Sequence, residues 1–299
     1  MDADNLIRTF QVGIAVLKGD FEKAIDIFMS PKPDDRPDAA QGRKDWQDRF
    51  QNGETAENEA AAAKRVVKRL NRFMTAEASA MQSLSRFPRD YKRAFTCIPK
   101  TLRMMFLHAV QSLVWNRAVS HRIQMNKTDV LPGDLVMAVE SDSTSVRVVT
   151  DEDIASSRFS ILDVVLPLIG SKSQFPTNKM GALMKDLLGE LGVSLESFKK
   201  VQDKDLALNG DYRKLLCRPA DFNYEIKEYY DPKQPLLQTD LMNLAGQDIK
   251  IAPAEEGQSK KIAMLVGFTL PSSSYATVAL RELMKKPTSS EYQKDLKLE

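Results

Sequence analysis

The helical pattern between residues 103 and 122 constrains the fold of this chain more than any other feature. Its apolar side chains recur at intervals of three or four residues, at Leu107, Val110, Val114 and Ala118. This spacing places them on one face of a helix, and such a face is stable in water only when other elements cover it. The sequence LPG at 131–133 then ends the helical part of the chain.

Short β-rich runs follow. LVMAV at 135–139 and VRVV at 146–149 flank a turn rich in Ser, Asp and Thr, which is the pattern of a hairpin. Further strands are expected at 213–217 and 224–229, and a helix at 177–191 with Thr177 as its N-cap. Helices first and strands later predict a mixed α+β fold.

The remaining segments are shorter helices and polar connections. At 9–29 the apolar spacing breaks near Gly19 and Asp20, which predicts two short helices. Residues 30–60 hold three prolines and many acids and amides, so we expect a loop there. We expect a linker at 246–257 and a tail at 287–299.

The stretch FTLPSSSYATVALREL, residues 268–283, predicts a strand, a turn and a helix. The strand runs from Ile262 to Leu270, Pro271 ends it, and a serine from 272–274 caps a helix that reaches Lys286. The buried face of that helix is expected at Tyr275, Val278, Ala279 and Leu283. Two interpretations remain open: the turn is pure architecture, or its exposed amides hold a phosphate while Phe268 stacks on a base.

Positive charge is concentrated between Lys64 and Arg103. This stretch holds eleven Lys and Arg against two acidic residues, although the whole chain carries only +2. Phe73, Phe87, Tyr91 and Phe95 lie among these cations. Either the stretch is a solvated helix face, or it binds a polyanion such as RNA, whose phosphates need cations and whose bases stack on rings.

Other classes of function find little support. Cys97 and Cys217 lie far apart and form no CxxC unit, and His108 and His121 are the only histidines. We therefore expect no disulfide framework, no metal and no cofactor. No apolar stretch approaches the roughly 18 residues of a membrane span, and the acidic start MDADNL is unlike a targeting segment. We expect the nucleus or the cytoplasm, and no membrane partner.

Six segments together carry a family resemblance: TFQVGIAVLKGDFEKAIDI, FLHAVQSLVWNRAVSHRI, LPGDLV, GDYRKLLCRP, DPKQPLLQTDLMNL and FTLPSSSYATVALREL. In this order, over about residues 9 to 286, the chain resembles the TruD family of RNA pseudouridine synthases, and its eukaryotic branch in particular. The resemblance implies a catalytic domain interrupted by an inserted domain, with RNA in the cleft between them. By that analogy residues 9–243 are the insertion, helical at 9–130 and β-containing at 131–243, and residues 258–286 return into the catalytic domain.

The resemblance also implies a reaction. The family isomerises uridine to pseudouridine in RNA without metal or cofactor, after flipping the target base out of its stack. Phe268 takes the place of the aromatic residue that lines the family's active site, and the turn with Ser272, Ser273 and Tyr275 shapes the pocket wall. The expected contacts to RNA phosphates come from Lys68, Arg69, Lys92 and Arg93.

Four further polar residues match the family pattern or stand in its motifs. Gln111, Asn116 and Arg122 lie on the helix at 103–122, where such side chains either belong to the site or satisfy nearby backbone groups. Arg213 of GDYRK either reaches a phosphate or pairs with a carboxylate. These residues are structural or supporting candidates.

The family's catalytic aspartate lies in a Gly-x-Lys-Asp motif, which residues 42–45 match. We interpret Asp45 as a decoy, because the motif should precede the segment at 12–20 and should continue with an alanine where this chain has Asp48. The family signatures expected before the first residue are absent too. We therefore expect the catalytic residue to lie on a missing N-terminal half, and the chain alone to make no pseudouridine.

Two alternatives stay open. The chain could be a non-catalytic RNA-binding or scaffold protein derived from such an enzyme, or a fragment of an ordinary enzyme. The RNA target, whether transfer, messenger or small nuclear, has no signal in the sequence.

Overall fold

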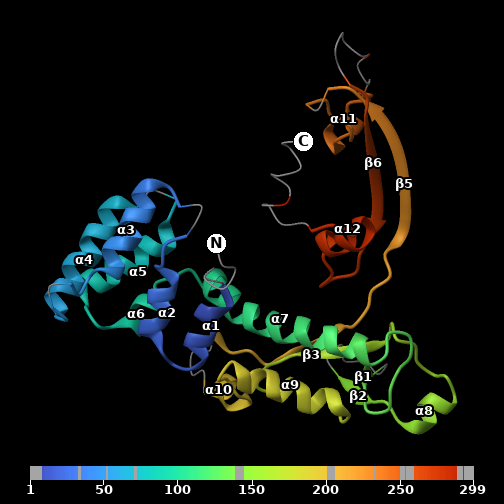
Figure 1. Ribbon diagram of the computed structural model, residues 1–299, viewed down its shortest axis with the longest axis horizontal. Coiled ribbons are helices and arrows are strands. Elements are labelled where there is room, and N and C mark those ends of the chain that lie inside the picture. The colour runs from blue at the N-terminus through green and yellow to red at the C-terminus, as the bar shows by residue number, and fades with distance from the viewer. Residues whose placement is uncertain are drawn as a thin grey trace. The chain divides into compact units, whose positions relative to one another are not determined.

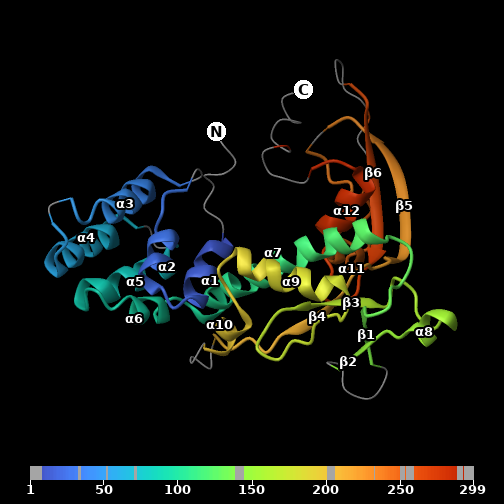
Figure 2. The ribbon, with the colours of Figure 1, turned by 60° about the horizontal axis from the view of Figure 1, so that its bottom comes forward.

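Figures 1 and 2 show the computed structural model of the chain. It describes residues 9–32, 35–51, 53–70, 73–138, 145–200, 206–231, 233–249, 253, 259–287 and 292. The chain forms two compact units, Met1–Leu215 and Leu216–Glu299. None of the described helices is both long and apolar enough to cross a membrane.

Up to Met125, the described residues of the first unit form seven helices: α1 (Thr9–Leu17), α2 (Phe21–Phe28), α3 (Pro37–Gln47), α4 (Ala56–Arg69), α5 (Thr75–Arg86), α6 (Tyr91–Thr96) and α7 (Lys100–Met125). The predicted break between the first two is confirmed. Gly19 takes a left-handed conformation with φ +76°, and the Asp20 carboxylate accepts a hydrogen bond from the Lys23 amide to cap α2.

The loop expected at 30–60 is wrong, because α3 occupies much of it and α4 begins at Ala56. Pro37 stands in the first turn of α3, where a missing amide hydrogen costs nothing. Trp46 is fully buried and donates its indole hydrogen to Asp26, 2.9 Å away. The buried Arg43 donates to the carbonyl of Phe28. These contacts to distant residues hold a helix whose own sequence is polar.

Helix α7 confirms the predicted long helix, and Leu107, Val110, Val114 and Ala118 are all buried. Its closest neighbour is α1. A Cβ added at Gly13 would lie 2.2 Å from the carbonyl oxygen of Phe106, so the two backbones touch only because Gly13 has no side chain. Figure 1 shows α7 running along the first unit.

A four-stranded antiparallel sheet completes the first unit. Its strands are β1 (Leu135–Met137), β2 (Val146–Val148), β3 (Val164–Leu168) and β4 (Asp211–Lys214), in the order β2-β1-β3-β4. The predicted hairpin is confirmed, since β1 pairs with β2. Helices α8 (Asp151–Ala155), α9 (Lys179–Glu190) and α10 (Leu195–Lys199) accompany the sheet. The cap of α9 is Asn178 rather than the predicted Thr177, because the Asn178 side chain accepts from the Met180 amide.

The second unit holds β5 (Ala220–Tyr229), α11 (Asp240–Leu244), β6 (Lys261–Thr269) and α12 (Ala276–Met284). Strands β5 and β6 form a separate antiparallel pair. The boundary between compact units falls at 215–216, whereas the expected insertion extends to 243, so β5 lies with the C-terminal segment. The domain assignment stays a prediction. Most of the expected linker at 246–257 and of the tail at 287–299 lies outside the described residues.

Helix α12 differs from its prediction in two ways. The residue before its first turn is Tyr275, which makes no side-chain capping bond, so the expected serine cap is wrong. None of its residues is buried, although Val278, Ala279 and Leu283 have the predicted helical spacing. The apolar face exists, but no described residue of this unit covers it.

Candidate functional site

The basic stretch divides into cations that serve the fold and cations that face solvent. Arg103 is buried and donates to the carbonyl of Ile98. Arg89 forms ion pairs with Glu54 and Glu59. Arg72 lies outside the described residues. The net charge of the stretch therefore overstates what is available to a ligand.

The predicted contact residues on α4 differ from each other. Lys68 is exposed, and no ion pair joins it to another described residue. Arg69 donates through Nε to the Asp45 carboxylate at 2.7 Å. Half of its side chain is exposed, but part of its charge is neutralised.

The predicted contact residues on α6 also differ. The Arg93 guanidinium lies 3.9 Å from the centre of the Phe87 ring and 3.9 Å from Asp90. The ring is itself exposed, so the pair presents a flat, cationic surface on which a base could stack. Lys92 is exposed and lines a cavity in the same unit.

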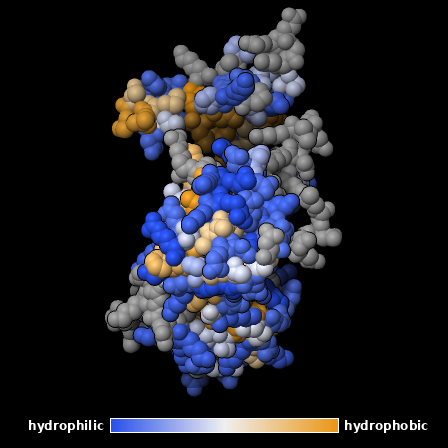
Figure 3. All heavy atoms as spheres, turned by 90° about the vertical axis from the view of Figure 1, so that its left-hand side faces the viewer, coloured by the Kyte–Doolittle hydropathy of each residue, from blue (hydrophilic) through white to orange (hydrophobic). Residues whose placement is uncertain are grey.

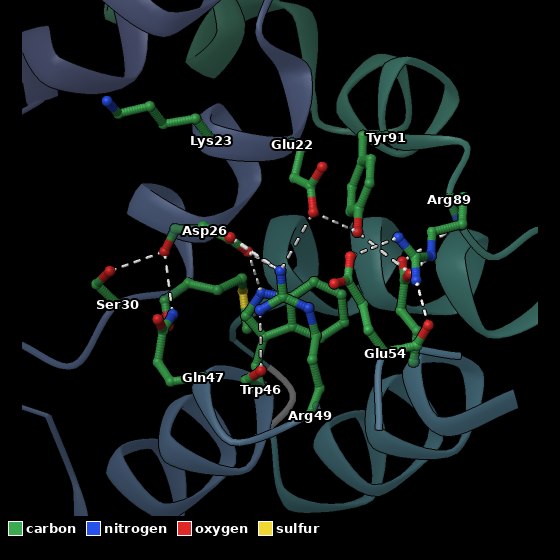
Figure 4. Close-up of polar contacts among 12 residues, drawn as sticks. Glu22, Lys23, Asp26, Ser30, Trp46, Gln47, Arg49, Glu54, Arg89 and Tyr91 are labelled. Carbon is green, nitrogen blue, oxygen red and sulfur yellow. Dashed lines mark hydrogen bonds and ion pairs between the residues drawn. The ribbon is translucent and has the colours of Figure 1, made fainter. Parts of the chain in front are cut away.

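A polar network joins the helices of this part of the first unit (Figure 4), and no sequence pattern predicted it. The Arg49 guanidinium binds Asp26 at 2.8 Å and lies 4.3 Å from the centre of the Trp46 ring. The Tyr91 hydroxyl lies 3.0 Å from a Glu22 carboxylate oxygen and 3.2 Å from one of Glu59. These groups come from α2, from α3 and the turn after it, from α4 and from α6, and they join these helices.

The network shifts two proton affinities. Burial raises the pKa of the Glu59 carboxyl, against the opposing effect of its hydrogen bonds from Arg89 and Tyr91. Burial also raises the pKa of the Tyr91 hydroxyl, as does the nearby charge of Glu59. A phenol that holds its proton so tightly is a hydrogen-bond donor, and its role here is to bind the carboxylates of two helices.

Asp45 is not in the loop that the sequence predicted but on α3. One carboxylate oxygen accepts from the Gln41 side chain at 2.8 Å and the other from Arg69 at 2.7 Å. No described cavity includes it. Its interactions are those of a helix-linking side chain.

The C-terminal candidates lie around the turn after β6. Phe268 is half-buried near the end of the strand, and Ser272 and Ser273 are exposed. Ser273 adopts a left-handed conformation with φ +65°. Tyr275 is 58% exposed. The turn thus presents a ring, two hydroxyls and the first amides of α12 within a few residues.

The polar candidates of α7 and β4 have separate environments. Gln111 is buried and donates to the carbonyl of Ile169 at 2.8 Å. Asn116 is exposed. The Arg213 guanidinium lies 5.0 Å from the centre of the Trp115 ring. Arg122 is fully buried and binds Asp134 of the LPGD turn, a partner that the sequence patterns did not reveal.

Comparisons with known proteins show which family this chain is similar to. A family model described as "tRNA pseudouridine synthase D (TruD)" matches residues 5–283. The fold is similar to a crystal structure of a putative tRNA pseudouridine synthase D from Methanosarcina mazei, with a TM-score of 0.66 and 24% identity over 93% of this chain and 57% of that one. The mixed α+β fold predicted from the sequence is confirmed.

Two curated relatives are more similar in sequence. "Pseudouridylate synthase 7 homolog" of Homo sapiens is 32% identical over 296 residues, which cover 97% of this chain and 41% of that protein. "Multisubstrate pseudouridine synthase 7" of Schizosaccharomyces pombe is 32% identical over an alignment of 308 residues, which covers 95% of this chain and 43% of that protein. The chain spans about two-fifths of the length of these relatives.

The family model and these relatives therefore define the class of protein to which the chain is related. Specifically, the chain belongs to the TruD family, as its motifs predicted.

Proposed function

We propose that this chain forms part of an RNA pseudouridine synthase whose catalytic aspartate lies on a further N-terminal segment. The chain supplies the surfaces that hold RNA and the turn that closes the pocket around the flipped uridine. It acts in the nucleus or cytoplasm, without metal or cofactor. The relatives' names support the class of reaction, and their greater length supports the further segment.

The observation that carries this proposal is the uncovered sheet of the second unit. In the β5–β6 pair Tyr224 lies opposite Val266, and Ile226 lies opposite Met264. Opposite residues share a face, and so do residues two apart on one strand. One face of the pair therefore carries five apolar side chains at paired positions: Tyr224, Ile226, Ile262, Met264 and Val266.

This face is exposed. Tyr224, Ile226 and Ile262 each expose more than three-fifths of their surface, and hydrophobic surface is visible on this unit at the top of Figure 3. A two-stranded sheet is marginal in water by itself, and a strongly apolar face requires a covering layer. We assign that layer to the N-terminal part of the catalytic domain. The relatives are more than twice as long as their match to this chain, which leaves enough sequence for such a part.

This proposal assigns roles to seven of the candidate residues. Phe268 stacks on the extruded base, and the turn with Ser272, Ser273 and Tyr275 offers donors to the flipped nucleotide. Lys68, Lys92 and Arg93 hold phosphates of the surrounding RNA. Asp45 takes no part in the reaction, because its carboxylate is bound to Arg69 and Gln41.

The test is complementation. The segment of the Schizosaccharomyces pombe relative that precedes its match to this chain is purified, mixed with this chain and incubated with an RNA pool. Chromatography of the digested RNA should show pseudouridine only from the mixture. A mixture that forms a stable complex and binds RNA without making pseudouridine would instead favour the non-catalytic RNA-binding or scaffold protein.

A further inference from the structure

A cavity of about 230 Å³ in the first unit is lined by three lysines from separate segments. Lys18 follows α1, Lys92 is in the first turn of α6, and Lys200 caps the C-terminus of α10. Thr96 and Ser197 add hydroxyl groups to the same wall. The other lining residues are Val16, Leu17, Gly19, Phe21 and Leu206, so no acidic residue is among the described lining.

The three ammonium groups have no described ion-pair partner. Lys199, the sequence neighbour of Lys200, forms an ion pair with Glu196 at 2.8 Å, whereas Lys200 interacts with the Glu196 charge only at longer range and lines the cavity. Like charges gathered around a small cavity repel one another, and an anion between them removes that repulsion.

Lys18 lies against the turn between α9 and α10. A Cβ added at Gly192 would be 2.6 Å from Lys18 Nζ, so the ammonium lies directly beside the backbone of this turn. Gly192 also has φ +64°, a conformation that suits glycine in the turn between α9 and α10. Lys18 thereby reaches from α1 across to the segment that carries Ser197 and Lys200.

We propose that this cavity binds a phosphate group of the RNA backbone. Lys18, Lys92 and Lys200 donate to its oxygens, and Ser197 adds a hydroxyl donor, since its oxygen only accepts from the Ser194 amide. Lysines that line one cavity from three segments suit a tetrahedral anion with several acceptor oxygens, whereas planar carboxylates are matched by the fork of arginine. The inference rests on the proposed function, which supplies RNA as the ligand.

The test is a binding titration of the full chain with a labelled single-stranded RNA. Binding is measured by fluorescence anisotropy at several salt concentrations. The cavity variant carries Lys18→Gln, Lys92→Gln and Lys200→Gln. The matched control carries Lys44→Gln, Lys172→Gln and Lys214→Gln, three exposed lysines elsewhere in the first unit. Both variants lose three charges, and circular dichroism with thermal unfolding verifies that both stay folded.

The cavity variant should bind RNA about tenfold more weakly or worse at low salt, and the slope of log affinity against log salt should fall in magnitude by about 0.7, the value for the one phosphate contact that the variant loses on a single strand. The control should keep affinity and slope close to those of the unmodified chain. Equal behaviour of the two variants would overturn the cavity assignment and leave the proposed function standing. No RNA binding by the unmodified chain would instead contradict the proposed function itself.

A parallel titration with labelled poly-glutamate separates RNA from an acidic protein segment. The unmodified chain and the cavity variant should bind this peptide equally weakly. If the cavity substitutions weaken poly-glutamate binding and leave RNA binding unchanged, the cavity is a site for an acidic protein, and the phosphate assignment is wrong.

Discussion

The Arg122 guanidinium and the Asp134 carboxylate form an ion pair in which both side chains are fully buried, with Nη2 and Oδ2 2.6 Å apart. Arg122 also donates to the carbonyls of Asn126 and Asp129, and Asp134 accepts from the Leu131 amide and the Asn178 side chain. The pair therefore joins the end of α7 to the LPGD turn and to the start of α9. The two family motifs FLHAVQSLVWNRAVSHRI and LPGDLV therefore meet at this point in the core.

Removing the charge of Asp134 should strongly destabilise the first unit. Asp134→Asn leaves the Arg122 cation buried without its counter-ion, and such a change typically costs about 3–5 kcal/mol. Arg117→Gln is the control, because its ion pair with Glu190 is about half exposed and should contribute only about 0–1 kcal/mol. Urea unfolding gives both values, and similar midpoints for the two variants would contradict the structural role of the buried pair.

The Glu59 carboxyl should make stability depend on pH. Burial raises its pKa above the ordinary value of 4.5 in the folded chain, so the folded state holds this proton more tightly than the unfolded state. The resulting stabilisation is complete below about pH 4.5 and is lost as the pH rises through the raised pKa. Glu59→Gln cannot titrate and should lack this part of the fall.

Urea unfolding at several pH values between 4 and 7 measures the effect of Glu59. The control is Glu57→Gln, which removes an exposed carboxylate of the same helix. If the stability of Glu59→Gln relative to the unmodified chain does not improve with rising pH, Glu59 is not the group that burial shifts.

Reversing the four predicted contact charges should weaken RNA binding for every RNA sequence. Reversal of Lys68, Arg69, Lys92 and Arg93 removes phosphate contacts, which carry no sequence information, and reduces the salt dependence. Among single changes, Lys68→Glu should lower the RNA affinity measured by filter binding more than Arg69→Glu does, since the Arg69 charge is already bound to Asp45. Unchanged affinity in the fourfold variant would remove this surface from the RNA site.

Phe268→Ala should harm turnover of the completed enzyme more than it harms folding. A ring stacked on an unpaired base contributes about 1–3 kcal/mol to binding, and Phe268 is only half-buried in this chain. Turnover per folded molecule and thermal unfolding are measured on the complex with the N-terminal segment. A large loss of stability with normal turnover would make Phe268 a packing residue.

Local patterns were sufficient where neighbouring residues determine the structure. The break at Gly19, the face of α7 and the β1–β2 hairpin each depend on spacing or turn chemistry within a few residues. Helix α3 was missed because its stability comes from outside its sequence. Its Trp46 and Arg43 bind Asp26 and Glu77, which are 20 and 34 residues away.

The candidate site shows the same division. The assignment of Phe268 and its turn to the site stays a prediction, and the amphipathic spacing of α12 could not reveal whether a covering layer is present in this chain. Charge counting located the basic stretch, but it could not show that Arg69, Arg89 and Arg103 have partners within the fold. Lys18 and Lys200 gave no signal, because only the tertiary structure brings them to the cavity of Lys92.

The most direct test of whether this chain contains an active site is tritium release from uridine-labelled RNA. The chain alone and its Asp45→Ala variant are each incubated with a broad RNA pool, beside the mixture with the N-terminal segment. We predict no release from the chain alone or from the variant, and equal release when either is combined with that segment. Release from the chain alone that disappears in Asp45→Ala would contradict this prediction and make Asp45 the catalytic residue.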